Sequence, residues 1–230
     1  MSINQNEIQM SESFLTAAFL SVSGGLQDAY TYISRGSVFA NAQTGNIVLL
    51  CHYICETNLA AAISYLIPLV FFALGVATAE YIHQKYQMTE QLHWRQLILI
   101  IEIFLLFGVG FMPASFNVIA NAIVSFSCAM QVQAFRKVNS YAYASTMCIG
   151  NMRSGMESLC KYQMTKDKAA LHKSMHYFGI IFLFGLGAAI GSMLINYFGM
   201  RSIWASCILL LVSFSLMFIK GDSIEDTDRE

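Results

Sequence analysis

The chain has 230 residues, of which 56% are hydrophobic and only 12% are charged, and its mean hydropathy is +0.54. Long apolar runs separated by short charged clusters are typical of a polytopic membrane protein and argue against a soluble domain. The formal net charge of −1, with neither a basic patch nor a zinc-finger spacing, gives no sign of nucleic-acid binding.

Six apolar runs are long enough, or nearly so, to form membrane-spanning helices, which need about 20 apolar residues. In chain order they are Phe14 to Ile33, Leu59 to Ile82, Leu97 to Met112, Phe116 to Phe135, Tyr177 to Tyr197 and Ile203 to Ile219. Two further segments, Ser37 to Cys55 and Tyr141 to Leu159, are ambiguous because polar residues interrupt them, and each contains a Gly-Asn pair. The sequence therefore predicts an all-α transmembrane bundle over residues 14–219, between an N-terminal tail (1–13) and an acidic cytoplasmic tail (220–230).

The number of spans can be judged from the basic residues, which concentrate on the cytoplasmic side of a membrane. If only the six clear runs span, 11 of the 13 basic residues lie on one side of the membrane and 2 on the other. A seventh span at Ser37 to Cys55 gives 12 to 1, whereas eight spans leave a 6 to 6 division and place Arg153 in lipid. Charge does not separate six spans from seven. Both predict a cytoplasmic C-terminus, and we prefer six because of an internal repeat.

The repeat is seen when the two Gly-Asn pairs are aligned. Matching Gly45-Asn46 with Gly150-Asn151 also brings Asp28 onto Gln133, each 17 residues before its glycine. Each half, about 14–112 and 116–219, then contains three spans and one Gly-Asn segment. Because three is an odd number, the second half is inverted in the membrane. Inverted repeats with broken or re-entrant segments are typical of transporters, although chance similarity between apolar segments is the competing explanation.

The Gly-Asn pairs suit a break in a helix at membrane depth. Glycine tolerates irregular backbone, and the asparagine amide can bond to groups that the interrupted helix leaves unpaired. The alternative is that Asn46 and Asn151 only hold helices together.

Asp28 is the most suggestive single residue, because a carboxylate within a membrane span is costly and indicates a functional site. It lies about 9 Å along the helix from the outer end of the first run. It would bind a cation or proton, or orient a polar substrate beside Gln27 and Asn46. The alternative is a carboxylate near the interface that pairs with Arg35 or caps backbone groups.

Other polar residues complete the predicted path. Glu102 is a second intramembrane acid, either a proton site or a partner of Arg95 or Trp94 at the interface. Gln133 either lines the path or packs against another helix. The predicted substrate or ion path consists of Asp28, Gln27, Asn46, Thr44, Gly45, Asn151, Gly150, Gln133 and Glu102.

An enzyme is not expected, since the common hydrolase and ATPase motifs are absent from the sequence. Cys51 and Cys55 share a helix face, but no further ligands complete a metal site, and the six cysteines read as small hydrophobic residues. We therefore predict no cofactor and no metal.

A family resemblance rests on "SGGLQDAYTYISRGSVFANAQTGNIVLL" and on "AYASTMCIGNMRSGMESL". Gly-Gly followed by Asp28-Ala29, then Phe39-Ala40-Asn41, then Thr44-Gly45-Asn46, resembles the bacterial YoaK family over nearly the whole chain. That family commonly has Thr-Gly where this chain has Ile149-Gly150. The resemblance implies an integral membrane protein of the bacterial cytoplasmic membrane and does not itself imply transport.

The leading functional hypothesis is a secondary transporter or channel for a small polar solute or ion, with Asp28 as a proton-coupling group. The alternative is a membrane partner or assembly protein without a substrate path, and an intramembrane enzyme ranks last. The expected partners are membrane lipids and the solute, with no nucleic acid, and a homo-oligomer is compatible with the sequence.

Overall fold

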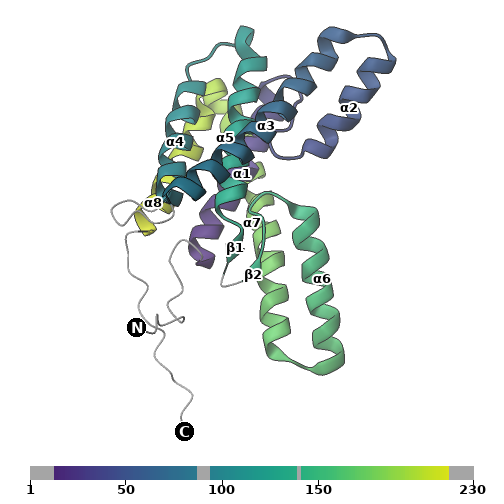
Figure 1. The fold of residues 1–230 in the computed structure, drawn as a ribbon, viewed down its shortest axis with the longest axis vertical. Helices are drawn as coiled ribbons and strands as arrows, with labels where there is room; N and C mark the ends of the chain where they lie inside the picture. Colours follow the sequence, from purple (N-terminus) through teal and green to yellow (C-terminus); the bar gives the residue numbers. More distant parts are fainter. Residues whose placement is uncertain (1–12, 87–93, 139–140, 218–230) are drawn as a thin grey trace.

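The computed structural model describes residues 13–86, 94–138 and 141–217, and these residues are helical almost throughout (Figure 1). Apart from Ser13, the predicted tails 1–13 and 220–230 lie outside the described residues. A pair of two-residue strands, β1 (Lys137–Val138) and β2 (Tyr141–Ala142), is antiparallel, with Lys137 opposite Ala142. The all-α class is confirmed.

Every segment that the sequence picks out contains one helix. The helices are α1 (Phe14–Ser34), α2 (Gln43–Cys55), α3 (Leu59–Tyr86), α4 (Trp94–Val109), α5 (Asn117–Ala134), α6 (Cys148–Thr165), α7 (Lys168–Phe198) and α8 (Trp204–Leu216), with short 3-10 turns η2 (Ala114–Phe116) and η3 (Gly199–Ile203). The largest difference from prediction is in α7, which begins at Lys168 and not at Tyr177. Asp167 caps this helix by accepting a hydrogen bond from the Ala169 N–H (2.9 Å), so the charged turns before the apolar run are helical too.

Three helical stretches are long and apolar enough to cross a membrane, judged by length and composition. They are Leu59–Tyr86, Ala114–Ala134 and Lys168–Leu216, the last of which joins α7, η3 and α8. The prediction of six or seven spans exceeds what this criterion identifies among the described residues, and it stays a prediction.

The two halves of the chain are intertwined. Helix α1 packs along α7 and α8, while α5 packs along α3 and α4, so the first helix of each half lies against the last two helices of the other. Helix α4 also contacts α8, and the shared core includes Leu20, Ile98, Leu106, Val124 and Leu210. One bundle therefore contains both halves.

Glycines allow the long helices to cross at close range. A Cβ at Gly25 of α1 would overlap the carbonyl oxygen of Phe184 in α7, and a Cβ at Gly75 of α3 would overlap the carbonyl oxygen of Phe126 in α5. Both interhelical crossings thus depend on a missing side chain.

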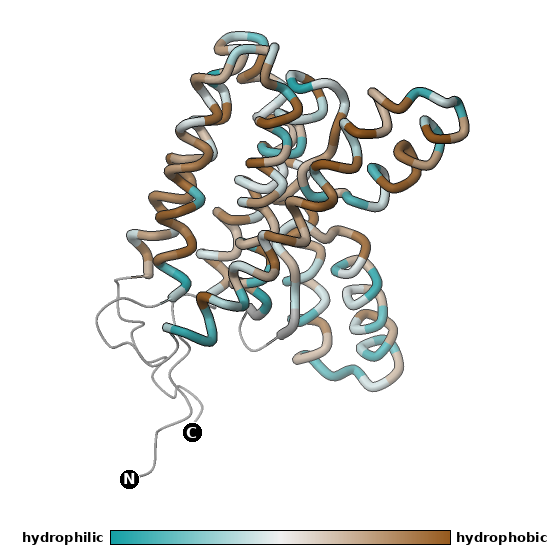
Figure 2. Tube along the Cα trace, turned by 45° about the horizontal axis from the view of Figure 1, so that its top comes forward, coloured by the Kyte–Doolittle hydropathy of each residue, from teal (hydrophilic) through white to brown (hydrophobic). Residues whose placement is uncertain are grey.

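The outer faces of the bundle are apolar. Phe104 on α4 is 73% exposed and Phe182 on α7 is 71% exposed, and Figure 2 shows the hydrophobic colouring of α3 and α4 against the more hydrophilic α6. Large aromatic side chains pointing outward from long helices suit a lipid surrounding.

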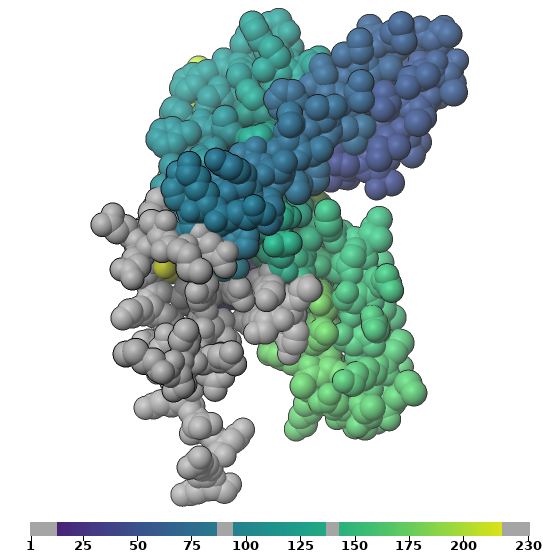
Figure 3. Space-filling model, viewed as in Figure 1, coloured from purple at the N-terminus to yellow at the C-terminus, as the bar shows by residue number. Residues whose placement is uncertain are grey.

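Two helical hairpins project from the same side of the bundle. The α2–α3 hairpin and the α6–α7 hairpin point towards opposite ends of the molecule and leave a notch between them (Figure 1, Figure 3). Helix α2 packs on α3, and α6 packs on α7. The N-terminal ends of α2 and α6 therefore face the same region.

Candidate functional site: the cavity between the N-terminal ends of α2 and α6

A cavity of about 450 Å³ lies where α2 and α6 begin. It is lined by Asp28 of α1, residues 41–44 leading into α2, residues 146–150 leading into α6, Phe72 of α3 and Phe184 of α7. Both halves of the chain contribute their Gly-Asn region to this one cavity. Of the nine residues predicted to form a path, Asp28, Thr44 and Gly150 line it.

Asp28 is buried and joins α1 to the segment before α2. Its Oδ1 accepts hydrogen bonds from the Asn41 backbone N–H (2.8 Å) and from Asn41 Nδ2 (3.4 Å). The bond from the Asn41 N–H corresponds to the predicted alternative in which Asp28 caps backbone groups. Because Asp28 also lines the cavity, it holds the wall and presents an ionisable group there.

Asn46 and Asn151 make the same backbone contacts in the two halves. Asn46 Oδ1 accepts from the Phe39 N–H (3.1 Å), and its Nδ2 donates to the Phe39 carbonyl (2.7 Å). Asn151 Oδ1 accepts from the Ala144 N–H (3.4 Å), and its Nδ2 donates to the Ala144 carbonyl (2.7 Å). In both cases the asparagine lies seven residues after its partner.

These contacts change the role expected for the two asparagines. They do not line the cavity, since each buried amide is engaged with the non-helical segment that precedes its helix. The irregular backbone is also placed differently from the prediction. It precedes the Gly-Asn pairs, and Gly45 and Gly150 lie within the first turns of α2 and α6. Asparagine satisfies the backbone at the break, as expected, but from inside the helix.

Neither helix that faces the cavity has its N-terminus capped by a side chain. The N-cap residues are Ala42 for α2 and Met147 for α6, and the first turn of each helix contains no acidic residue. The N-terminal end of a helix carries partial positive charge and N–H groups that lack partners within the helix. Two such ends therefore give the cavity a positive potential opposite Asp28.

Gly24 determines how close the α6 end comes to Asp28. A Cβ at Gly24 would overlap Cγ2 of Thr146, which lines the cavity just before α6. Gly24 also accepts, at its carbonyl, a hydrogen bond from Asn41 Nδ2 (3.4 Å). The residues before both short helices thus meet α1 one turn before Asp28.

Gln27 and Glu102 belong to a buried polar network inside the bundle, and neither lines the cavity. Gln27 Nε2 donates to Ser23 Oγ (3.0 Å), Ser206 Oγ (2.9 Å) and Glu102 Oε1 (3.3 Å), and its Oε1 accepts from Cys128 Sγ (2.7 Å). Ser23 and Ser206 also hydrogen-bond to each other. This network joins α1, α4, α5 and α8. Glu102 therefore bonds within the bundle, although an interfacial role was the alternative.

Arg35 does not pair with Asp28. Its guanidinium donates to the Val109 carbonyl (3.0 Å), the Met112 carbonyl (2.9 Å) and the Tyr30 hydroxyl (2.6 Å). The charge thus complements the negative C-terminal end of α4. Gln133, the predicted equivalent of Asp28, lies away from the cavity and donates to Glu80 Oε2 (2.7 Å).

Sequence reasoning missed Asn41, Gln43, Thr146 and Cys148 as cavity residues. Asn41 and Thr146 stand at matching distances before the two Gly-Asn pairs, so the repeat alignment contained a signal for both. Cys148 gave none, because a single cysteine in an apolar segment usually packs as a small hydrophobic residue.

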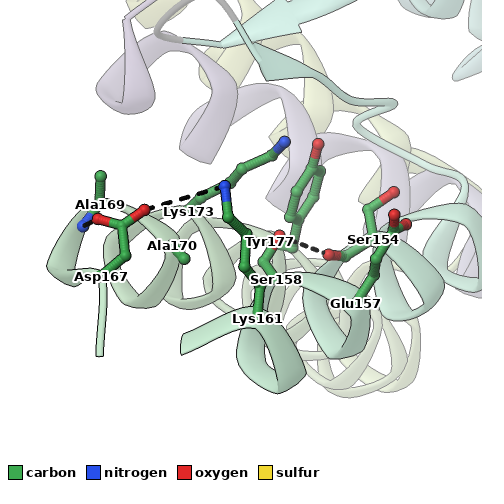
Figure 4. A pocket seen from close by; sticks show the side chains of 9 residues that line it. All are labelled: Ser154, Glu157, Ser158, Lys161, Asp167, Ala169, Ala170, Lys173 and Tyr177. Atoms are coloured by element: carbon green, nitrogen blue, oxygen red, sulfur yellow. Dashed lines mark hydrogen bonds and ion pairs between the residues drawn. The ribbon is translucent and has the colours of Figure 1, made fainter. Parts of the chain in front are cut away.

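A second cavity, of about 500 Å³, lies on the α6–α7 hairpin (Figure 4). Lys161 Nζ is 3.9 Å from Asp167 Oδ2, and Ser158 Oγ donates to the Ser154 carbonyl (2.8 Å). Glu157 and Lys173 also line it, so both signs of charge meet there. The lysines of this hairpin would be attracted to anionic lipid headgroups.

No metal site is found in residues 13–86, 94–138 and 141–217, where no three His, Cys, Asp or Glu side chains are grouped closely enough to hold an ion. The arrangement offers binding by hydrogen bonds and charge.

Apolar outer helices, buried carboxylates and a cavity that presents one of those carboxylates define an α-helical membrane protein. The chain belongs to the family described as "Protein of unknown function (DUF1275)", whose sequence model matches residues 16–216. It is 27% identical over 202 residues to the UPF0700 transmembrane protein YoaK of Bacillus subtilis (strain 168), with 84% of this chain and 88% of that protein covered. No solved structure matches the chain. The resemblance to the YoaK family is confirmed, and the chain is a transmembrane protein of that family.

Proposed function

We propose that the protein is a secondary transporter or channel for a small polar solute, and that the cavity between α2 and α6 is its translocation site. The observation that carries the proposal is the meeting of two uncapped helix N-termini, one from each half, with the Asp28 carboxylate in one cavity. Transporters commonly bind substrate where discontinuous helices meet at the interface of two repeats.

An inverted repeat is part of the proposal. Its support is the equivalence of the Asn46–Phe39 and Asn151–Ala144 contacts, the reciprocal packing of α1 on α7 and α5 on α3, and the opposite directions of the two hairpins (Figure 1). In this arrangement α1, α3, α4, α5, α7 and α8 are the six spans. Helices α2 and α6 start at the cavity and run outward to opposite sides of the bilayer.

The orientation we propose places the α6–α7 hairpin on the cytoplasmic side of the bacterial cytoplasmic membrane, together with the C-terminus. Lys161, Lys166, Lys168 and Lys173 lie on this hairpin, whereas the α2–α3 turn at residues 56–58 has no basic residue. The positive-inside rule favours this assignment.

Asp28 would bind a proton or the cationic part of the solute within the cavity. We assign it no chemical step, so the proposed activity is binding and translocation without catalysis. The competing function, a membrane partner without a substrate path, requires that water and solute do not reach the cavity.

Cys148 provides a native probe for that distinction, because it lines the cavity. The other five cysteines would be replaced by serine, and the remaining thiol would be tested in right-side-out and inside-out vesicles with a charged methanethiosulfonate. We expect modification from at least one side. A variant that keeps only Cys207, a buried thiol on α8 outside the cavity, is the matched control and should react much more slowly.

Flux provides the second measurement. Proteoliposomes would be screened for solute-driven proton or ion movement, and Asp28→Asn should abolish coupled flux while Glu80→Gln, outside the cavity, should not. An unreactive Cys148 on both sides, absent flux, and co-purification of one stoichiometric partner would together reject transport in favour of the partner role.

A further inference from the structure

The cavity has one positive wall. Helices α2 and α6 have 13 and 18 residues, both begin at the cavity, and neither N-cap residue supplies a side-chain acceptor. Helix N-termini of this kind bind carboxylate and phosphate groups through backbone N–H groups and the helix dipole. A ligand group placed between the two ends would therefore be anionic.

Asp28 and Asn41 lie together on the α1 side of the cavity. Asn41 lines the cavity, is only 7% exposed, and donates from Nδ2 to Asp28 Oδ1 and to the Gly24 carbonyl (both 3.4 Å). Because the donating Nδ2 must face these two acceptors, the other terminal atom of the amide is assigned as the oxygen Oδ1. It accepts no hydrogen bond from any residue that the structure describes. That oxygen has no accessible surface, so a ligand in the cavity does not reach it. The acidic group open to a ligand is the Asp28 carboxylate, which lines the cavity and calls for a donor from the ligand.

The protein does not supply that donor as a cation. Among the described residues that line the cavity, none is lysine, arginine or histidine. A simple anion would leave the Asp28 carboxylate unmatched, and a simple cation would face the positive ends of two helices. A ligand with both charges satisfies both walls.

The volume and the lining of the cavity suit a small molecule. The cavity volume of about 450 Å³ lies within the usual range of ligand sites, roughly 300–1,000 Å³. Phe72, Ile149 and Phe184 supply an apolar surface beside the polar groups, which would contact a short hydrocarbon part.

We infer that this cavity binds a small zwitterion, with its carboxylate between the N-terminal ends of α2 and α6 and its ammonium group at Asp28. The inference deepens the proposed transport function and rests on the same site, but binding can be measured without transport.

The test uses four probes of similar size with the full-length protein in detergent: L-alanine (zwitterion), propionate (anion), ethylamine (cation) and lactamide (neutral). Thermal unfolding is recorded at increasing concentrations of each. We expect L-alanine to raise the midpoint temperature in a saturable manner, and each of the other probes to bind at least tenfold more weakly. Asp28→Asn should weaken L-alanine binding at least tenfold and leave propionate binding no weaker, whereas Glu80→Gln should bind L-alanine as the unmodified chain does.

Each outcome bears on the inference. Equal or tighter binding of propionate, ethylamine or lactamide overturns it, and so does the absence of saturable L-alanine binding. The comparison of probes on the unmodified chain decides the matter even if Asp28→Asn does not fold. Counterflow of radiolabelled L-alanine in proteoliposomes separates the two proposals: saturable binding without counterflow supports the zwitterion site and rejects transport, while flux of a different solute class supports transport and rejects the zwitterion.

Discussion

Replacing Asn46 or Asn151 by alanine tests whether these amides hold the irregular backbone before α2 and α6. Asn46→Ala removes three hydrogen bonds: from the Phe39 N–H (3.1 Å), to the Phe39 carbonyl (2.7 Å) and to Gln43 Oε1 (2.9 Å). At about 1 kcal/mol each, the free energy of unfolding should fall by about 3 kcal/mol. Asn151→Ala removes two hydrogen bonds, one of them 3.4 Å long, so a fall of about 1–2 kcal/mol is expected.

The measurement is reversible unfolding of the purified protein in mixed micelles of increasing SDS fraction, followed by circular dichroism. Asn58→Ala is a matched control, because Asn58 is exposed and its Oδ1 accepts from the Ala61 N–H (3.2 Å) at the start of α3. Its cost should be about 1 kcal/mol or less.

The isosteric variant Asn46→Asp gives the sharpest result. It keeps the shape of the side chain but replaces the donating nitrogen by an oxygen that would face the Phe39 carbonyl. The loss of stability should be at least as large as that of Asn46→Ala. If Asn46→Asp is as stable as the unmodified chain, Asn46 does not hold the irregular backbone before α2, and its short hydrogen bonds contribute nothing to stability.

Three further predictions concern packing and buried polar groups. Gly25→Ala should lower the yield of folded protein, because the added Cβ would overlap the Phe184 carbonyl. Gly150→Ala has open space at its Cβ and should be neutral or stabilising by about 0.5–1 kcal/mol. Size-exclusion profiles of the two variants provide the comparison. Arg35→Ala should destabilise by about 3 kcal/mol or more, measured by the same SDS titration, because carbonyl groups at the end of α4 lose their donor; a near-neutral result would show that water replaces it. Gln27→Leu should cost at least about 2 kcal/mol, since three buried acceptors and the Cys128 thiol lose their partner; an unchanged unfolding curve contradicts this.

Much of the helical framework could be predicted from sequence, because apolar runs of spanning length leave little choice of secondary structure. The run from Leu59 corresponds to α3, and the run from Phe14 corresponds to α1. The start of α7 could not be predicted from hydropathy, because it depends on the Asp167 cap and on charged turns outside the apolar run.

Asp28 could be identified as a site residue by its residue type alone, since a carboxylate in an apolar helix is costly. Its neighbour Gln27 was grouped with it by position in the chain. Adjacent residues on a helix point in different directions, so Gln27 joins the Glu102 network while Asp28 reaches the cavity. The repeat alignment marked the position of Asn41, but its contact with Asp28 could not be predicted, because that contact arises only when the segment after α1 folds back onto Asp28.

The asymmetry between the two halves explains how a cavity built from similar parts can orient its ligand. In the proposed repeat, the α2 and α6 ends are equivalent and contribute the same partial charge, so they cannot by themselves distinguish one end of a solute from the other. The halves differ at the position of Asp28, because its counterpart Gln133 is neutral and bonds to Glu80 outside the cavity. Asp28 is therefore the one acidic residue among those that line the cavity in the described part of the chain. One acid opposite two helix ends creates a field with a single direction, and this gives a dipolar solute one preferred orientation.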